Sequence, residues 1–383
     1  MNKSLNTFRA FAFFGIFLFH TIRFGFGYIG VNAFFVLSGY LITPILLKTK
    51  DNTPSFKQYL KNFYGRRMLR IFPAYYFYLL AITAIVLIAG WQHHDIFNVF
   101  FSQLSWLLTY TFNFFTASRF FVSNYLDAHF WSLAVEEQFY IFFPLLIFFV
   151  PYRKLKNTFI LIILLGPLIR FLTGYIVDHH LLSVINPWKE LTVYVLPFSN
   201  IDAFVIGGFF SVYLRKYTPG TGIIVGSFIG IISVGILTSY LFTNHYNLSS
   251  ISSLGYGSIM QDSYKYIWAY TLFSFFFAML LLRLNKRDLW PSIFENNILN
   301  YLGKISYGLY IYHLAIFQMV ILHAKLLHID STSVMLQRTY TAIVTLIITI
   351  IISILSFELF ESRIIALKDK LFPKHAVVEN EAG

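Results

Sequence analysis

An arginine and a histidine in the first apolar segment have the types and spacing that acid–base chemistry in a buried site would need. Arg9 and His20 are separated by ten residues. On an α-helix, eleven steps of 100° bring His20 back to within about 20° of Arg9, about 16 Å along the axis. The two side chains therefore share one helix face. A neutral His20 could act as a general base, and the alternatives are a snorkelling arginine and a hydrogen-bonded structural histidine.

Two adjacent carboxylates, Glu136 and Glu137, lie in a later apolar segment. Neighbouring side chains on a helix point in different directions, so both cannot face one partner. One could pair with a buried cation such as Arg170 while the other meets water or orients a base; a purely structural ion pair is the alternative. Asp202 and His313 also lie in apolar segments, and the sequence assigns no role to them or to Arg170.

Three arginines precede the third apolar segment, at Arg66, Arg67 and Arg70. On a helix, positions 66 and 70, or 67 and 70, share a side. The trio could therefore bind phosphate groups through bidentate hydrogen bonds. Attraction to anionic lipid headgroups is the alternative, together with the general excess of basic residues on the cytoplasmic side of a membrane.

The composition indicates which kind of protein must position these residues. Of 383 residues, 57% are hydrophobic and 12% are charged, against roughly 25% charged in an ordinary globular protein. The absence of cysteine excludes disulfides, thiolate nucleophiles and cysteine zinc sites. A net charge of +12 is compatible with nucleic-acid binding, but in a chain with many spans Lys and Arg gather in cytoplasmic loops. We expect an integral membrane protein with no nucleic-acid partner and no metal.

Eleven apolar runs are candidate membrane spans. The basic segment 48–70 should be cytoplasmic, and counting eleven spans from there would place the basic segment 151–157 outside. One run must therefore not span. Run 98–117 is interrupted by many polar residues, and we expect it to be re-entrant or interfacial. The ten remaining runs lie near 5–24, 28–47, 71–90, 131–150, 158–177, 191–214, 222–243, 266–283, 305–323 and 338–360.

With ten spans, 21 of the 29 Lys and Arg residues fall in cytoplasmic segments, which places both termini inside. The predicted fold is an all-α, polytopic bundle of about ten transmembrane helices with one re-entrant or interfacial segment. It comprises a transmembrane domain over 1–365 and a short cytoplasmic tail over 366–383. Small residues at Gly222, Gly226 and Gly230 recur every four positions and predict a close helix contact.

Five motifs, in order along the chain, resemble those of the membrane-bound acyltransferase-3 family, which O-acylates cell-surface carbohydrates. The resemblance covers residues 5 to about 360, and Asn32 stands where the family usually has Asp. The motifs are Arg9 to His20, Gly30 to Thr43, Arg66 to Pro73, Phe130 to Tyr140 and Gly303 to His313.

The resemblance implies a multi-pass enzyme of the bacterial cytoplasmic membrane. It would take an acyl group, most often acetyl, from acyl-CoA inside and place it on a hydroxyl of a surface glycan or lipid-linked saccharide outside. The arginines at 66, 67 and 70 would then hold the CoA phosphates. His20 would be the general base, Glu136 or Glu137 would orient it, and Arg9 would offset developing negative charge.

Two other functions fit parts of the sequence. A glycan transporter or flippase without acyltransferase activity would also contain buried charges and ten spans, although the chain shows no paired halves. A membrane O-acyltransferase that modifies lipids or proteins would also use a buried histidine, although the ordered motifs argue against it. The sequence leaves open the glycan, the hydroxyl, the acyl length and whether transfer is direct or passes through an acyl-enzyme.

Overall fold

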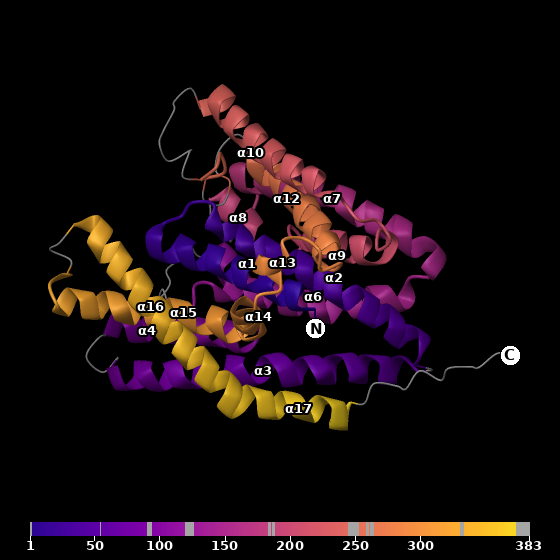
Figure 1. Cartoon of the computed structure of the whole chain (residues 1–383). Helices are drawn as coiled ribbons and strands as arrows, with labels where there is room; N and C mark the ends of the chain where they lie inside the picture. The colour runs from indigo at the N-terminus through magenta and orange to yellow at the C-terminus, as the bar shows by residue number, and fades with distance from the viewer. Residues whose placement is uncertain are drawn as a thin grey trace.

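In the computed structural model, residues 2–53, 55–89, 94–118, 126–182, 185, 188–243, 253–257, 260, 264–329 and 333–372 are described, and every regular element in these ranges is helical (Figure 1). The helices are α1 (Lys3–Ile22), α2 (Gly30–Asp51), α3 (Phe56–Ala89), α4 (His94–Leu108), α5 (Phe112–Ser118), α6 (Phe130–Phe149), α7 (Tyr152–Asp178), α8 (Lys189–Val195), α9 (Ile201–Tyr213), α10 (Thr221–Thr243), α12 (Lys265–Leu284), α13 (Pro291–Phe294), α14 (Asn297–Lys304), α15 (Ser306–Leu326), α16 (Val334–Ser356) and α17 (Ser362–Leu371). A 3-10 turn (Gly27–Ile29) precedes α2, and a π-helical turn (Phe357–Glu361) joins α16 to α17.

Nine helical stretches within these ranges are long and apolar enough to cross a membrane. They are α1, α2, α3, α6, α7, α10, α12, α15 and the continuous stretch from α16 to α17. This confirms the prediction of an all-α, multi-pass membrane protein. The predicted boundary between residues 365 and 366 falls inside α17, and residues 373–383 of the tail lie outside the described part.

Two predicted segments are not single helices. Run 98–117 is divided between α4 and α5 by a turn in which Tyr110 has a positive φ of 53°; its re-entrant or interfacial position stays a prediction. Run 191–214 was wrongly predicted as one span, because the chain breaks between α8 and α9. Pro197 lacks a backbone donor, and the Asn200 side chain donates instead to the carbonyls of Tyr194 and Leu196, at 2.8 and 2.9 Å.

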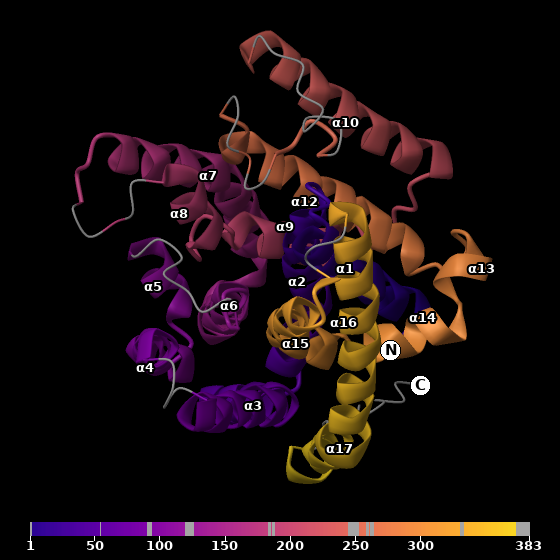
Figure 2. The ribbon, with the colours of Figure 1, turned by 90° about the vertical axis from the view of Figure 1, so that its left-hand side faces the viewer.

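Helices α1 and α2 occupy the centre of the molecule, with α3 and α17 on one side and α10 on the other (Figure 2). Glycines bring α2 into backbone contact with α9: a Cβ on Gly39 would overlap the carbonyl of Phe204, and one on Gly207 would overlap that of Val36. Nothing lies within 4 Å of a Cβ built on Gly222, Gly226 or Gly230. The close contact predicted at these three glycines is therefore wrong for the described residues; on the same helix, Gly235 is the glycine that packs closely, against Gly255 and Tyr256.

Segments predicted to be cytoplasmic contact one another. Asn2 bonds to the carbonyl of Leu284 at the end of α12, and the Tyr152 hydroxyl donates to Asp51 at 2.5 Å. Lys50 at the end of α2 donates to the last carbonyls of α6, at 2.9 and 3.0 Å. Each contact joins segments that the charge distribution predicts to lie at the same side of the membrane; which side that is stays a prediction.

Candidate active site

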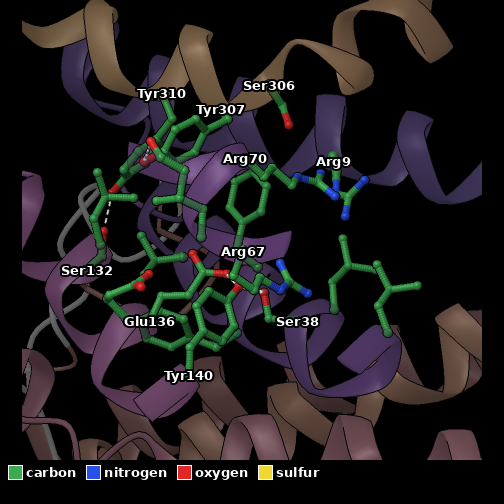
Figure 3. A pocket seen from close by; sticks show the side chains of 18 of the residues that line it. Arg9, Ser38, Arg67, Arg70, Ser132, Glu136, Tyr140, Ser306, Tyr307 and Tyr310 are labelled. Atoms are coloured by element: carbon green, nitrogen blue, oxygen red, sulfur yellow. Dashed lines mark hydrogen bonds between the residues drawn. The ribbon is translucent and has the colours of Figure 1, made fainter. Parts of the chain in front are cut away.

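A pocket between α1, α2, α3, α6 and α15 collects five of the seven residues predicted to carry chemistry (Figure 3). Arg9 comes from α1, Arg67 and Arg70 from α3, and Glu136 and Glu137 from α6. The rest of the lining is apolar or carries hydroxyl groups, including Ser38, Tyr140, Ser132, Ser306, Tyr307 and Tyr310. The pocket therefore combines three cations and two carboxyl groups with a lining that is otherwise uncharged.

The three arginines of this pocket, Arg9, Arg67 and Arg70, are called the arginine cluster below. Arg9 donates to Asn6 Oδ1 at 3.2 Å, and the guanidinium of Arg67 lies 4.6 Å from the ring centroid of Tyr140. Among the described residues, neither Arg67 nor Arg70 has a carboxylate oxygen within 4.0 Å. Arg67 and Arg70 repel each other, and the carboxylates of Glu136 and Glu137 in the same pocket offset part of that repulsion. A bound anion would relieve the rest.

The two glutamates have different surroundings. Glu136 accepts hydrogen bonds from the hydroxyls of Ser38 and Tyr140, and Tyr140 also donates to Ser38 at 3.2 Å. Glu137 makes no hydrogen bond within the described part of the chain. Neither carboxylate bonds to His20, so the structure does not place them as its orienting partners.

Arg66 lies outside the pocket, although it neighbours Arg67 in sequence. Its guanidinium bonds to Asp369 at 2.7 Å and to the Phe372 carbonyl at 2.6 Å. Beside it, a Cβ on Gly65 would overlap the Phe372 ring. Arg66 thus links α3 to the C-terminal end of α17. It does not line the pocket with Arg67 and Arg70, the other two arginines of its motif.

His20 belongs to a group of three imidazoles, the histidine cluster, formed with His129 and His313. The ring centroids of His20 and His313 lie 5.4 Å apart, and those of His313 and His129 lie 4.8 Å apart. His129 precedes α6 and His313 lies in α15. Sequence reasoning missed His129, which directly precedes the motif from Phe130 to Tyr140; that adjacency was the signal available.

Two hydroxyls connect the histidine cluster to the pocket. Ser132 and Tyr310 both line the pocket, and their hydroxyl oxygens lie 2.6 Å apart. Both donate to the backbone carbonyl of His129, at 2.9 and 3.3 Å. The pocket wall opposite the arginine cluster therefore borders directly on the histidines.

All five sequence motifs line the same pocket, although they lie as far apart as Arg9 and Tyr310. Residues 2–358 match the model of a family described as an acyltransferase domain, type 3. The chain belongs to the acyltransferase-3 family.

Curated relatives of this acyltransferase-3 protein come from Staphylococcus aureus. It is 30% identical over 376 residues, 94% of this chain and 56% of the relative, to a protein of strain COL named "Putative O-acetyltransferase". It is 26% identical over 395 residues, 99% of this chain and 59% of the relative, to O-acetyltransferase OatA of strain NCTC 8325. The chain thus spans little more than half the length of these relatives. No solved structure matches it.

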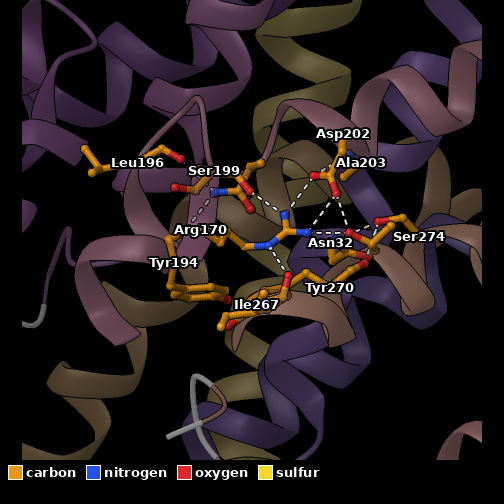
Figure 4. A network of polar contacts seen from close by, with 12 residues as sticks. Asn32, Arg170, Tyr194, Leu196, Ser199, Asp202, Ala203, Ile267, Tyr270 and Ser274 are labelled. Atoms are coloured by element: carbon orange, nitrogen blue, oxygen red, sulfur yellow. Dashed lines mark hydrogen bonds and ion pairs between the residues drawn. The ribbon is translucent and has the colours of Figure 1, made fainter. Parts of the chain in front are cut away.

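A buried cation of the acyltransferase-3 chain that lies outside this pocket, Arg170, is fully paired (Figure 4). Its Nη1 and Nη2 atoms each lie 2.9 Å from one oxygen of Asp202. Its remaining donors reach the Ser199 and Ile267 carbonyls, at 2.7 and 2.8 Å, and the Thr271 hydroxyl. Arg170 therefore does not pair with either glutamate, and the pairing with Asp202 holds α7, α9 and α12 together.

Asn32 lies beside this network and donates to Ser274 Oγ at 3.1 Å. A neutral side chain suits a position next to a completed ion pair, because another carboxylate would have no cation left to bind. Among the residues that the structure describes, no three His, Cys, Asp or Glu side chains are grouped to hold a metal ion.

Proposed function

We propose that this chain transfers an acyl group, acetyl in the first instance, from cytoplasmic acyl-CoA to a hydroxyl of a carbohydrate presented outside the cytoplasmic membrane. The observation that carries the proposal is the single pocket with an arginine cluster at one side and Ser132 and Tyr310, which contact the histidine cluster, at the other. A donor with several phosphates and an uncharged thioester arm fits this division of charge. The acceptor is a surface glycan or a lipid-linked saccharide.

Donor binding uses the cations of the pocket. CoA phosphates would accept charge-assisted hydrogen bonds from Arg67 and Arg70. Arg9 lies about 16 Å along α1 from His20 and lines the same pocket as the other two arginines. We therefore assign Arg9 to the charges of the donor instead of to the reacting carbonyl. Tyr140 supports Arg67 through its ring and is itself held by Glu136.

Acyl transfer takes place at the other side of the pocket. The thioester arm would extend past Ser132 and Tyr310, which bring its carbonyl toward His20. As the acceptor hydroxyl attacks that carbon, His20 takes the hydroxyl proton, the carbon–sulfur bond breaks, and the proton passes to the CoA thiolate. The products are an O-acyl ester and free CoA, so no other reactant is required.

The charge distribution supports the orientation of the enzyme. The segments rich in Lys and Arg, including the start of α3, would face the cytoplasm, where acyl-CoA is made, and both termini would lie there. The arginine cluster lies on that side of the pocket, since Arg67 and Arg70 belong to the first half of α3. The bilayer itself is then a partner of the long apolar helices.

The test uses inverted membrane vesicles from the source organism, with radiolabelled acetyl-CoA added to the exposed cytoplasmic face. We expect released CoA thiol and base-labile label in the glycan fraction. His20→Ala should lose activity by about 10²- to 10⁴-fold, and His20→Gln should be equally inactive, since an amide is not a base. His179→Ala, which removes an exposed histidine at the end of α7, should leave activity unchanged. A transporter or flippase would not consume acetyl-CoA, and a structural His20 would be rescued by glutamine.

A further inference from the structure

His313 and His129, the two imidazoles grouped with His20, each use one ring nitrogen in a hydrogen bond to a backbone carbonyl. His313 Nδ1 lies 2.7 Å from the carbonyl oxygen of Tyr310, and His129 Nε2 lies 3.2 Å from that of Ile311. A carbonyl oxygen can only accept, so His313 Nδ1 and His129 Nε2 carry the hydrogen. In the neutral rings the other nitrogens, His313 Nε2 and His129 Nδ1, can then only accept a hydrogen bond.

These two accepting nitrogens are buried and lack a hydrogen-bond partner within the described residues. Buried polar atoms in folded proteins are nearly always paired, so an unpaired one calls for an explanation, such as a bound water, a bound ion or a catalytic role. The ring of His20, which can donate a hydrogen bond, packs beside His313; it is partly exposed and lies on the neighbouring helix α1.

The separation of His20 and His313 fits such a contact. Two imidazoles joined by an N–H···N hydrogen bond of about 3 Å have centroids about 5.2 Å apart, because each nitrogen lies about 1.1 Å from its ring centre. The observed separation is 5.4 Å, with the ring planes at 47°. Phe13 packs on the edge of His313, at 5.8 Å between centroids, and His129 packs on it at 4.8 Å. His313 is thereby held in place while His20 remains open on one side.

We propose that His313 is the positioning residue for the base. When the His20 ring turns so that one N–H faces it, His313 Nε2 accepts a hydrogen bond from His20, which leaves the other nitrogen of His20 unprotonated and facing the acceptor hydroxyl. The same contact stabilises the His20 imidazolium that exists between proton uptake and proton delivery to the CoA thiolate. His313 takes no net proton itself. This inference rests on the proposed function and assigns to an imidazole the role that the sequence suggested for Glu136 or Glu137.

Two amide substitutions separate this role from a structural one. The asparagine amide of His313→Asn occupies the position of Nδ1, so it keeps the bond to the Tyr310 carbonyl and removes the acceptor. The glutamine amide of His313→Gln reaches the position of Nε2, so it keeps an acceptor and gives up the Tyr310 bond. We expect glutamine to retain kcat within about tenfold and asparagine to lose about 100-fold, as part of the 10²–10⁴ that a base contributes. Acetyl-CoA affinity should be unchanged in both.

The experiment is the inverted-vesicle assay with acetyl-CoA and the native membrane glycan. Equal activity of the two variants, or a more active asparagine variant, would show that His313 matters through the Tyr310 bond and would overturn the inference. If the wild type releases no CoA, or if His20→Ala remains active, then the proposed function, with His20 as its base, is wrong whatever the His313 variants do.

A spectroscopic measurement covers the case in which neither variant folds. In protein labelled with 15N-histidine, replacing His20 by Phe should move the Nε2 resonance of His313 toward that of a free, unprotonated ring nitrogen. An unmoved resonance would contradict the inference independently of activity.

Discussion

The arginine cluster, on α1 and α3, and the Arg170 network, which joins α7, α9 and α12, differ in how completely their charges are paired. All five N–H donors of Arg170 have acceptors, and its exposed fraction is 0%. Arg67 and Arg70 have no carboxylate within 4.0 Å among the described residues. The charge of Arg170 is therefore completed within the protein, and we propose that a ligand completes those of Arg67 and Arg70.

The difference distinguishes a structural role from a binding role. A buried ion pair is tolerated when every hydrogen bond is made, because desolvation is then offset. Unpaired cations that share a pocket cost stability through repulsion, and membrane proteins keep such charges where function requires them. The Arg170 network should therefore govern folding, and the arginine cluster should govern affinity for the donor.

The largest expected effect is on stability, in Arg170→Met. Removing one partner leaves the Asp202 carboxylate buried without a cation, which typically costs about 3–5 kcal/mol. The measurement is the thermal unfolding midpoint in detergent. The double variant Arg170→Met with Asp202→Leu should recover most of the loss, because no unpaired charge remains. A wild-type midpoint for the single variant would mean that the network does not support the fold.

Alanine at Arg67 or Arg70 should weaken donor binding and leave the stability of the protein largely unchanged. Each lost phosphate contact contributes about 1.5–3 kcal/mol, so the Kd for acetyl-CoA should rise roughly ten- to a hundredfold. The unfolding midpoint should change little, because the repulsion lost within the cluster is offset by the lost attraction to Glu136 and Glu137. Lysine should restore affinity only in part, since it lacks the planar fork. Unchanged affinity would favour lipid headgroups as the partners of these arginines.

The smallest effect is expected for Arg66→Ala, the matched control one residue away. The pair of Arg66 and Asp369 is partly exposed, with exposed fractions of 23% and 61%, and such pairs contribute about 0–1 kcal/mol. Acetyl-CoA titration should give a wild-type Kd. Asp369→Ala should likewise leave the Kd for acetyl-CoA unchanged. A tenfold loss of donor affinity in Arg66→Ala alone would return Arg66 to the donor site.

The sequence predicted the composition of the pocket better than its geometry. Helical spacing placed Arg9 and His20 on one face of α1, but the face that each residue presents to other helices depends on tertiary packing. Arg66 was grouped with Arg67 and Arg70 because the three share a motif. Its true partner, Asp369, lies about 300 residues away on α17, and no local pattern indicates that contact.

The span predicted over 191–214, the omission of His129 and the glycine contact predicted on α10 were wrong for physical reasons. Pro197 marks the break between α8 and α9, but the apolar character of 191–214 outweighed it. His129 lies just before a helix and outside the apolar runs, so a search for charges within spans did not include it. Glycine spacing indicated a packing face on α10, yet the backbone contacts form at Gly39 and Gly207. A repeat of small residues permits close packing without specifying a partner.

The central claim is that Arg67 and Arg70 bind the phosphates of the donor, and a combined change of ligand and residue tests it most directly. The affinities of acetyl-CoA and of S-acetylpantetheine, which has no phosphate, should be measured for the wild type and for both alanine variants in nanodiscs. The account predicts that each substitution weakens acetyl-CoA binding by at least about tenfold and leaves S-acetylpantetheine binding unchanged. Equal losses for the two ligands would show that these arginines act on the fold of the pocket, and would contradict the account.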